Sequence, residues 1–215
     1  MIYWQSVHAT PELSSDLIHV WRLPVCVSAD AERWLDTSER ARLDAMADSS
    51  GQMRMLATRA GLRQVLSGYL GCSPAEVPLR LAEGGKPHIP GGPSFNLSHG
   101  GELAMLAVAQ REVGIDVELQ RSVPRALAIA RRALDADTVE RLATLPADEL
   151  DDAFLVAWTA MEARQKCLGQ GVFGRRVGSD EVGGLAFAPD NLHLAFLAWV
   201  DAQHQPEIKW LELAS

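Results

Sequence analysis

The sequence predicts an α+β protein made of two halves with a similar layout. Along the 215 residues, strand-like and helix-like patterns follow one another as strand, helices, strands, and then helices and strands again, with the division near Arg111. Hydrophobic residues make up 47% of the chain, which is enough to bury a core. Charged residues, at 22%, are too few and too mixed in sign for a disordered protein. No residue-level repeat accompanies the similar layout.

The first half is expected to begin with a strand and to continue with two helices. Residues 16–25 are apolar and contain β-branched side chains, which is typical of a strand. Thr37 or Ser38 can cap the first helix. The second helix is expected from about 51 to 70, because its apolar side chains follow helical spacing, and Gly71 ends it.

A loop-rich segment and a pair of strands come next. Residues 74–93 contain several glycines and prolines, which favour turns over regular structure. Residues 103–109 and 113–119 are apolar runs of strand length. The polar residues 110–112 between them predict a hairpin turn.

The second half is expected to contain two helices followed by strands. Residues 125–142 and 147–168 have helical patterns, and Pro146 separates them. Short apolar runs alternate with turns over residues 185–213, which predicts two or three strands.

Charge and composition exclude several classes of protein. The chain has 20 basic and 28 acidic residues and a net charge of −8, which argues against a general nucleic-acid binder, because such proteins need a basic face. No apolar run approaches the ~20 residues of a membrane span, and the N-terminus lacks a signal-peptide pattern. Cys26, Cys72 and Cys167 are odd in number and far apart, which argues against a disulfide framework. We therefore expect a cytoplasmic protein that binds neither nucleic acid nor membranes.

Two carboxylates share one face of the strand expected over 113–119. Residues two apart on a strand point the same way, so Asp116 and Glu118 lie side by side while Ile115 and Val117 face the core. Adjacent carboxylates repel each other unless a cation lies between them, and oxygen ligands at this spacing suit Mg²⁺. The alternative is a solvated outer face of the strand, which is the commoner explanation of such a pattern.

Glu162 and Lys166 lie one helical turn apart, on one face of the helix expected over 147–168. Trp158 occupies the same face one turn earlier, beside an apolar stretch. These neighbours favour a functional pair. An ordinary surface salt bridge is the alternative.

A polar cluster, FNLSH over 95–99, comes just before the strand expected over 103–109. Ser98 and His99 can both donate hydrogen bonds to a phosphate group, and the two glycines that follow allow close backbone approach. A nucleophilic Ser–His pair is disfavoured, because adjacent side chains rarely face each other and no G-x-S-x-G elbow is present. The alternative is a loop histidine without a functional role. Cations scattered around this segment, each of a kind common on solvated surfaces, are Arg40, Arg54, Arg59, Arg63 and Lys86.

The segments occur in one characteristic order along the chain. This order is GGKP over 84–87, FNLSH over 95–99, GIDVE over 114–118 and W-x-x-x-E-A-x-x-K over 158–166. The sequence thereby resembles the Sfp-type 4′-phosphopantetheinyl transferases, in the subgroup whose helix motif begins with Trp and reads K-E-A. The similarity extends upstream to HVWRL at 19–23 and covers most of the chain.

The resemblance implies a fold and a reaction. The family fold is a pair of α+β halves related by a pseudo-twofold axis. Residues 1–111 would form the N-terminal half with the coenzyme A nucleotide contacts, and 112–215 the C-terminal half with the metal site and catalytic helix. The implied reaction transfers 4′-phosphopantetheine from coenzyme A to a serine of an apo acyl or peptidyl carrier protein, depends on Mg²⁺, and releases adenosine 3′,5′-bisphosphate. An internal pseudodimer of this kind favours a monomer.

The resemblance also assigns individual residues. Asp116, Glu118 and Glu162 match the family's Mg²⁺ ligands, and Lys166 and His99 match groups that contact phosphate. Glu162, Lys166 and His99 are the expected catalytic residues, with Glu162 as the base and Glu118 as the alternative base. The expected contacts to coenzyme A are Arg40, Arg54, Lys86, Pro87, Ser98, His99, Asp116 and Lys166.

One departure from the family pattern leaves alternatives open. Met161 stands where the family usually has Lys, immediately before Glu162. It motivates a second hypothesis, a weakened or non-catalytic paralogue that binds coenzyme A or a carrier protein. The carboxylates alone motivate a third, a Mg²⁺-dependent pyrophosphate hydrolase. Residues 121–134 combine arginines with apolar side chains and are a candidate docking surface for the carrier, with a plain amphipathic helix as the alternative.

Overall fold

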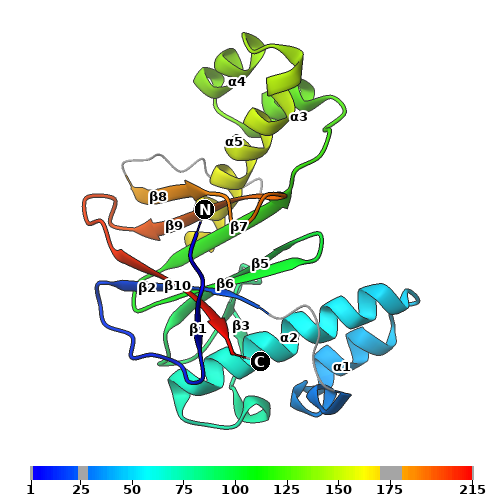
Figure 1. Ribbon diagram of the computed structural model, residues 1–215, viewed down its shortest axis with the longest axis vertical. Coiled ribbons are helices and arrows are strands. Elements are labelled where there is room, and N and C mark those ends of the chain that lie inside the picture. The colour runs from blue at the N-terminus through cyan, green and yellow to red at the C-terminus, as the bar shows by residue number, and fades with distance from the viewer. Residues whose placement is uncertain (1, 24–28, 170–180, 215) are drawn as a thin grey trace.

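A computed structural model describes residues 2–23, 29–169 and 181–214, and these form a mixed α+β structure (Figure 1). The helices are α1 (Thr37–Asp44), α2 (Ser49–Leu70), α3 (Ala126–Ala133), α4 (Ala136–Ala143) and α5 (Ala147–Cys167), with 3-10 helices at Ala29–Trp34 and Pro74–Glu76. The strands are β1 (Gln5–Val7), β2 (Leu17–Arg22), β3 (Arg80–Leu81), β4 (Pro87–His88), β5 (Ser94–Gly100), β6 (Leu103–Ala109), β7 (Val113–Leu119), β8 (Val182–Phe187), β9 (His193–Val200) and β10 (Glu207–Leu213). The expected fold class is confirmed.

The larger sheet has the strand order β1-β10-β2-β6-β5. Its central strands β2 and β6 are antiparallel, and β6 is antiparallel to β5. The last strand of the chain, β10, runs parallel to both β2 and β1, so the C-terminus completes the sheet of the first half. Helix α2 covers the outer face of this sheet, where its Leu62, Val65 and Leu66 pack against Trp21 and Leu106.

A second sheet has the order β7-β9-β8, with both pairs antiparallel. Helix α5 lies on its outer face. The contact is so close that a Cβ at Gly114 would lie 2.0 Å from the carbonyl oxygen of Ala163, and only glycine permits this approach. The inner faces of the two sheets share one core, in which Ile18 and Met105 of the first sheet meet Ile115 and Leu197 of the second. The layers are therefore α2, first sheet, second sheet and α5 (Figure 1).

The two halves repeat one connection. In the first, β2 leads through α2 to the β5–β6 hairpin, and β6 returns to pair with β2. In the second, β7 leads through α5 to the β8–β9 hairpin, and β9 returns to pair with β7. The strand orders β2-β6-β5 and β7-β9-β8 are thus equivalent, which is the topological similarity that the order of elements predicted. A boundary between residues 111 and 112 and an exact twofold relation remain predictions.

The helices of the first half begin at aspartates. Asp36 accepts hydrogen bonds from two backbone N–H groups and caps α1, so the expected cap at Thr37 or Ser38 is wrong by one or two residues. Asp48 caps α2 in the same way. The stop at Gly71 is confirmed, because this residue has the left-handed φ of 64° that ends helices. The strand expected over 16–25 is β2, and its last two expected residues lie outside the described part of the chain.

The hairpin expected between residues 103–109 and 113–119 is wrong. All seven residues of β6 are buried, and the strand has hydrogen-bonded partners along both of its edges. Strands β5 and β2 supply those partners, and β7 begins the second sheet. The segment 95–99, expected just before a strand, is itself part of β5 and forms the true hairpin with β6.

The single helix expected over 125–142 is two helices, α3 and α4. Leu134 adopts an extended conformation at the end of α3, and Asp135 then accepts a hydrogen bond from the Thr138 N–H to cap α4. These helices pack beside the first half of α5 at one end of the molecule (Figure 1). The tail forms three strands, as the upper estimate predicted. None of the described helices is long and apolar enough to cross a membrane.

Candidate functional site

The two sheets meet where β5 runs beside β7, and side chains of β5 close the gap. Asn96 Oδ1 accepts a hydrogen bond of 2.8 Å from the Ile115 N–H, and Ser98 Oγ accepts one of 3.4 Å from the Val117 N–H. These bonds replace the backbone ladder that a continuous sheet would have. The polar motif therefore sits at the seam because β7 leaves N–H groups that need acceptors there.

A charged cluster lies on this seam. Asp116 is 3% exposed, and its Oδ1 accepts hydrogen bonds from Ser98 Oγ at 2.9 Å and from Lys166 Nζ at 2.6 Å. Lys166 Nζ also lies 3.2 Å from Ser98 Oγ and 3.7 Å from Glu162 Oε2. Strand β5, strand β7 and helix α5 thus bring Ser98, Asp116, Glu162 and Lys166 together.

Glu162 has a pKa well above the ordinary value of a glutamate side chain. Burial raises its pKa, the negative charge of Asp116 raises it further, and Lys166 opposes both, with a smaller contribution from Glu118. The resulting pKa of Glu162 is about 7. A carboxylate with such a pKa can take up a proton near neutral pH, which is the requirement for a general base.

The chemistry of these oxygens fits a hard cation such as Mg²⁺. Asp116 Oδ2 is buried and has no hydrogen-bond partner, so one carboxylate oxygen at the centre of the cluster receives no hydrogen bond. Burial and the charge of Asp116 raise the pKa of Glu162, and a cation beside these oxygens would offset both effects. Within the described ranges no three acidic, histidine or cysteine side chains already surround one point, and Glu118 Oε2 accepts a 2.7 Å hydrogen bond from Arg121.

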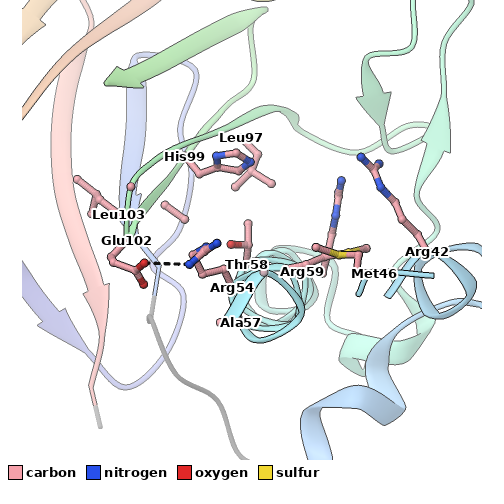
Figure 2. A pocket seen from close by; sticks show the side chains of 14 residues that line it. Arg42, Met46, Arg54, Ala57, Thr58, Arg59, Leu97, His99, Glu102 and Leu103 are labelled. Atoms are coloured by element: carbon pink, nitrogen blue, oxygen red, sulfur yellow. Dashed lines mark hydrogen bonds and ion pairs between the residues drawn. The ribbon is translucent and has the colours of Figure 1, made fainter. Parts of the chain in front are cut away.

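A separate pocket, here called the arginine pocket, lies between α1, α2 and the β5–β6 hairpin (Figure 2). Its volume is about 290 Å³, and Arg42, Arg54, Arg59 and His99 are among its lining residues. Burial lowers the pKa of Arg59; nearby Glu39 opposes this shift and the positive charge of Arg42 adds to it. The pocket therefore concentrates cations, which suits a ligand with several negative charges.

Ser98 and His99 serve different sites although they are neighbours. Successive strand residues point to opposite faces, so Ser98 faces Asp116 and Lys166 while His99 lines the arginine pocket. Strand β5 is consequently the shared wall between the charged cluster and the arginine pocket.

Comparison with known proteins places this geometry in a family. A model of the 4′-phosphopantetheinyl transferase superfamily matches residues 112–193, which include Asp116, Glu118, Glu162 and Lys166. The chain is 34% identical over 170 residues to the 4′-phosphopantetheinyl transferase HetI of Nostoc sp. (strain PCC 7120), a match that covers 74% of this chain and 72% of that protein. The chain belongs to the 4′-phosphopantetheinyl transferase family.

Other relatives match shorter stretches. A putative 4′-phosphopantetheinyl transferase of Synechocystis sp. (strain PCC 6803) is 28% identical over 145 residues, which cover 65% of this chain and 59% of that protein. The transferase Sfp of Bacillus subtilis (strain 168) is 31% identical over 113 residues, or 52% of this chain and 50% of that protein. The resemblance expected from the motifs is confirmed, and the chain is an enzyme of this transferase class.

Within this transferase the cations assigned from sequence lie in different places. Arg54 lines the arginine pocket, where it donates hydrogen bonds to Ser50 Oγ at 2.7 Å and Glu102 Oε1 at 3.2 Å (Figure 2). Arg40 does not line the pocket; it is exposed and donates to the backbone carbonyl of Leu35. Its contact with coenzyme A remains a prediction.

Arg42 and Arg59 are pocket residues that the sequence did not assign to the site. Arg59 was one of many scattered cations, and Arg42 had no motif of its own. The sequence offered only the positions of these arginines around their helices. Arg59 lies five residues after Arg54, and Arg42 lies two residues after Arg40, which is ~200° further around the helix axis. Neither spacing identifies a pocket until α1 is packed against α2.

Lys86 and Pro87 are not among the residues that line the arginine pocket. Lys86 Nζ donates to Glu112 Oε2 at 2.6 Å and to the carbonyl oxygens of Val113 and Cys167 at 3.2 and 3.1 Å. All three ammonium hydrogens thus have partners, and the side chain ties its loop to the start of β7 and the end of α5. Both residues also line a second pocket near Phe95. Their contact with the nucleotide of coenzyme A remains a prediction.

Met161, the departure from the family pattern, faces away from the charged cluster. It packs with the apolar residues of α3, α4 and α5 and lines a groove between α4 and α5. Residue 161 lies ~100° from residue 162 around the helix axis, so the two side chains leave α5 in different directions. Methionine at this position is therefore compatible with an intact cluster of Glu162 and Lys166.

Proposed function

We propose that this transferase moves 4′-phosphopantetheine from coenzyme A to a serine hydroxyl of an apo acyl or peptidyl carrier protein, in a Mg²⁺-dependent reaction that releases adenosine 3′,5′-bisphosphate. The observation that carries the proposal is the shared wall. Strand β5 has the charged cluster of Asp116, Glu162 and Lys166 on one face and the arginine pocket on the other. A ligand with a pyrophosphate and a third phosphate needs both.

The arginine pocket would hold the phosphorylated nucleotide end of coenzyme A. Arg42, Arg54 and Arg59 supply guanidinium donors that match phosphate oxygens in pairs, and His99 adds a donor from β5. Arg54 must exchange its hydrogen bond to Glu102 for one to phosphate. That exchange costs little, because the pair is largely exposed.

The charged cluster would carry out the transfer. The serine oxygen attacks the phosphorus on the pantetheine side of the pyrophosphate, and the bond from that phosphorus to the bridging oxygen breaks. The serine proton passes to Glu162, the expected base, and the electron pair of the broken bond leaves on the nucleotide phosphate. Lys166 and His99 donate hydrogen bonds to phosphate oxygens that gain charge.

Asp116, Glu118 and Glu162 would hold Mg²⁺, and Asp116 Oδ2 is the oxygen whose missing partner most clearly calls for one. When bound, the ion would supply positive charge that neutralises the pyrophosphate. Ser98 fixes the orientation of Asp116 through its 2.9 Å hydrogen bond and would act as a positioning residue.

The proposed partners follow from the same reading. The carrier protein would present its serine to the cluster beside α3, where exposed Arg131 and Arg132 offer a basic surface. The equivalent strand orders of the two halves support a monomer, because one chain already supplies both sides of the seam. Burial raises the pKa of the Cys167 thiol to about 12, so this thiol stays protonated at neutral pH.

One assay tests the proposal. The purified chain is incubated with coenzyme A, Mg²⁺ and an apo carrier protein, and the carrier is examined by mass spectrometry while nucleotide release is followed. We expect the carrier to gain the mass of phosphopantetheine, one nucleotide to be released per transfer, and both to stop in chelator. Nucleotide release without a carrier would indicate the hydrolase instead. Coenzyme A binding without either product would indicate a binding protein.

A further inference from the structure

His193 is buried at the start of β9, where it bridges the two sheets next to the proposed site. Its Nδ1 lies 2.8 Å from Asp190 Oδ1 in the β8–β9 turn, and its Nε2 lies 3.0 Å from the carbonyl oxygen of Gly100 at the end of β5. One imidazole ring therefore connects the second sheet to the strand that carries Ser98 and His99.

Both atoms that the ring meets are acceptors. Partial burial tends to raise the pKa of Asp190, but the hydrogen bonds from His193 and the Leu192 N–H, with the charge of Arg22, hold the pKa below its usual value. An ionised carboxylate and a carbonyl oxygen each need a donor. The two nitrogens of the His193 ring are the groups that face these acceptors, so the ring is held between Asp190 and the Gly100 carbonyl.

The Gly100 carbonyl belongs to the wall of the arginine pocket. His99, Gly101, Glu102 and Leu103, on either side of Gly100, all line that pocket. The backbone of this turn is packed against the second sheet: a Cβ at Gly100 would lie 2.7 Å from the carbonyl oxygen of Val117 and 3.1 Å from the Cα of Glu118. A shift of the turn would therefore move the pocket relative to the strand of the carboxylates.

We propose that His193, held by Asp190, is a positioning residue that fixes the β5–β6 turn of the arginine pocket in register with Asp116 and Glu118 on β7. The inference rests on the proposed function, in which coenzyme A spans both places. His193 touches neither substrate nor reacting atoms. Its effect is to keep the nucleotide phosphates and the reacting phosphorus at the correct separation, and a misplacement of ~1 Å in such an arrangement can cost ~10²-fold in rate.

The test compares His193→Leu, which removes both bonds, with His193→Gln, whose amide N–H can still donate to Gly100. His204→Gln is the matched control, because His204 also pairs with an aspartate, Asp16, at 3.3 Å, but in the partly exposed β9–β10 turn. We expect kcat, normalised to the folded fraction, to fall by about 10- to 100-fold in His193→Leu. It should recover at least partly in His193→Gln and stay within about twofold of wild type in His204→Gln. The KM for the carrier should not move.

A spectroscopic readout separates this role from a general loss of structure. In the ¹H–¹⁵N spectrum of the wild-type imidazoles, we expect a slowly exchanging, hydrogen-bonded proton on His193 Nε2, which faces the Gly100 carbonyl. Asp190→Asn should make that proton exchange faster, because the ring loses its carboxylate partner, and should lower kcat as His193→Leu does. If His193→Leu does not fold, Asp190→Asn provides the same test, because Asp190 lies in the turn between β8 and β9.

Two results would overturn the inference: the absence of a hydrogen-bonded His193 Nε2 proton in the wild type, or wild-type kcat in folded His193→Leu or Asp190→Asn. Failure of the proposed function is a different result, in which wild-type protein transfers nothing from coenzyme A. In that case the ¹⁵N spectrum and the affinity for adenosine 3′,5′-bisphosphate, measured in the wild type and in Asp190→Asn, still decide whether His193 controls the pocket.

Discussion

Lys166 Nζ lies 2.6 Å from Asp116 Oδ1, and this contact joins α5 to β7 where the two sheets meet. The two residues are 50 positions apart, and each was paired in the sequence with a different neighbour, Lys166 with Glu162 and Asp116 with Glu118. Ser98 bonds to both and brings a third segment to the same point. The proposed chemistry of this transferase therefore depends on three segments whose side chains bond to one another.

The first prediction concerns Asp116. Asp116→Asn keeps the size of the side chain but removes the charge that attracts Lys166 and the oxygen that suits a cation. We expect kcat for transfer to fall by about 10²-fold or more, because charge stabilisation in a buried site is lost. Asp44→Asn, on the exposed face of α1, is the control. Near-normal transfer by folded Asp116→Asn in Mg²⁺ would remove Asp116 from the site.

The second prediction separates the arginines. Arg42→Ala and Arg59→Ala each remove a guanidinium from the arginine pocket, whereas Arg40→Ala removes one that lies outside it. A charge-assisted hydrogen bond contributes about 1.5–3 kcal/mol, so we expect the KM for coenzyme A to rise by about 10- to 100-fold for the first two variants. Coenzyme A titrations in parallel measure this. A larger effect from Arg40→Ala would instead support the assignment made from sequence.

The sequence predicts well the features that depend on short-range periodicity. The shared face of Asp116 and Glu118 follows from the two-residue repeat of a strand, and the end of α2 at Gly71 follows from the left-handed conformation that glycine adopts easily. The fold class and the repeated order of elements follow from the same local patterns. The family motifs then connect segments that periodicity alone treats as separate.

Features that depend on which strands pair could not be read from local patterns. The hairpin expected around residues 110–112 is wrong because β6 is paired along both of its edges, with β2 and β5, and β7 belongs to the other sheet. The pairing of β10 with β2 spans almost the whole chain. Arg42 enters the arginine pocket only because α1 packs against α2, and His193 reaches Gly100 only because β9 lies beside β7.

The third prediction concerns stability at acid pH. Burial lowers the pKa of His19 to about 4, with a contribution from the charge of Lys209. In the unfolded chain this group takes up its proton near its ordinary value of 6.5, so the unfolded state binds the proton first as the pH falls. The contribution to folding is therefore complete above about pH 6.5 and declines between pH 6.5 and 4, by up to about 3 kcal/mol.

Urea unfolding between pH 7.5 and 4.5 measures this effect. His19→Gln cannot take up the proton, so its free energy of unfolding should fall less steeply across that range than the wild type's. His8→Gln, at an exposed position, should follow the wild type. Parallel curves for wild type and His19→Gln would show that His19 is not the group responsible.

The fourth prediction concerns Met161. Because this side chain packs among α3, α4 and α5, Met161→Lys places an amine in an apolar groove and adds no cation to the charged cluster. We expect no gain in transfer at limiting coenzyme A and a loss of about 1 kcal/mol in stability. Met53→Lys, at an exposed position on α2, should change stability by less than about 0.5 kcal/mol. A clear gain in transfer by Met161→Lys would show that the position does influence the site.

The fifth prediction concerns docking of the carrier. The chain's net charge of −8 gives no long-range attraction for an acidic carrier, so docking requires a local basic surface. Helix α3 offers one: Arg131 and Arg132 are exposed, while Ala126 and Ala130 are buried and hold the helix in place. The helix packs against α5, which carries Glu162 and Lys166 of the charged cluster.

Arg131→Glu combined with Arg132→Glu reverses this local charge without touching the buried face of α3. Arg125 is left unchanged, because its left-handed φ of 68° makes a substitution there difficult to interpret. We expect the KM for an acidic carrier to rise by about 10-fold at low salt, and the difference to shrink as salt screens the surface. The KM for coenzyme A should stay constant, because none of these arginines lines the arginine pocket. The control is Arg33→Glu with Arg80→Glu, two exposed positions in the 3-10 helix Ala29–Trp34 and in β3, which matches the change in net charge. An equal rise in the carrier KM for both double variants would mean that only net charge matters. A parallel rise in both KM values for the α3 variant would place these arginines in the nucleotide site or the fold.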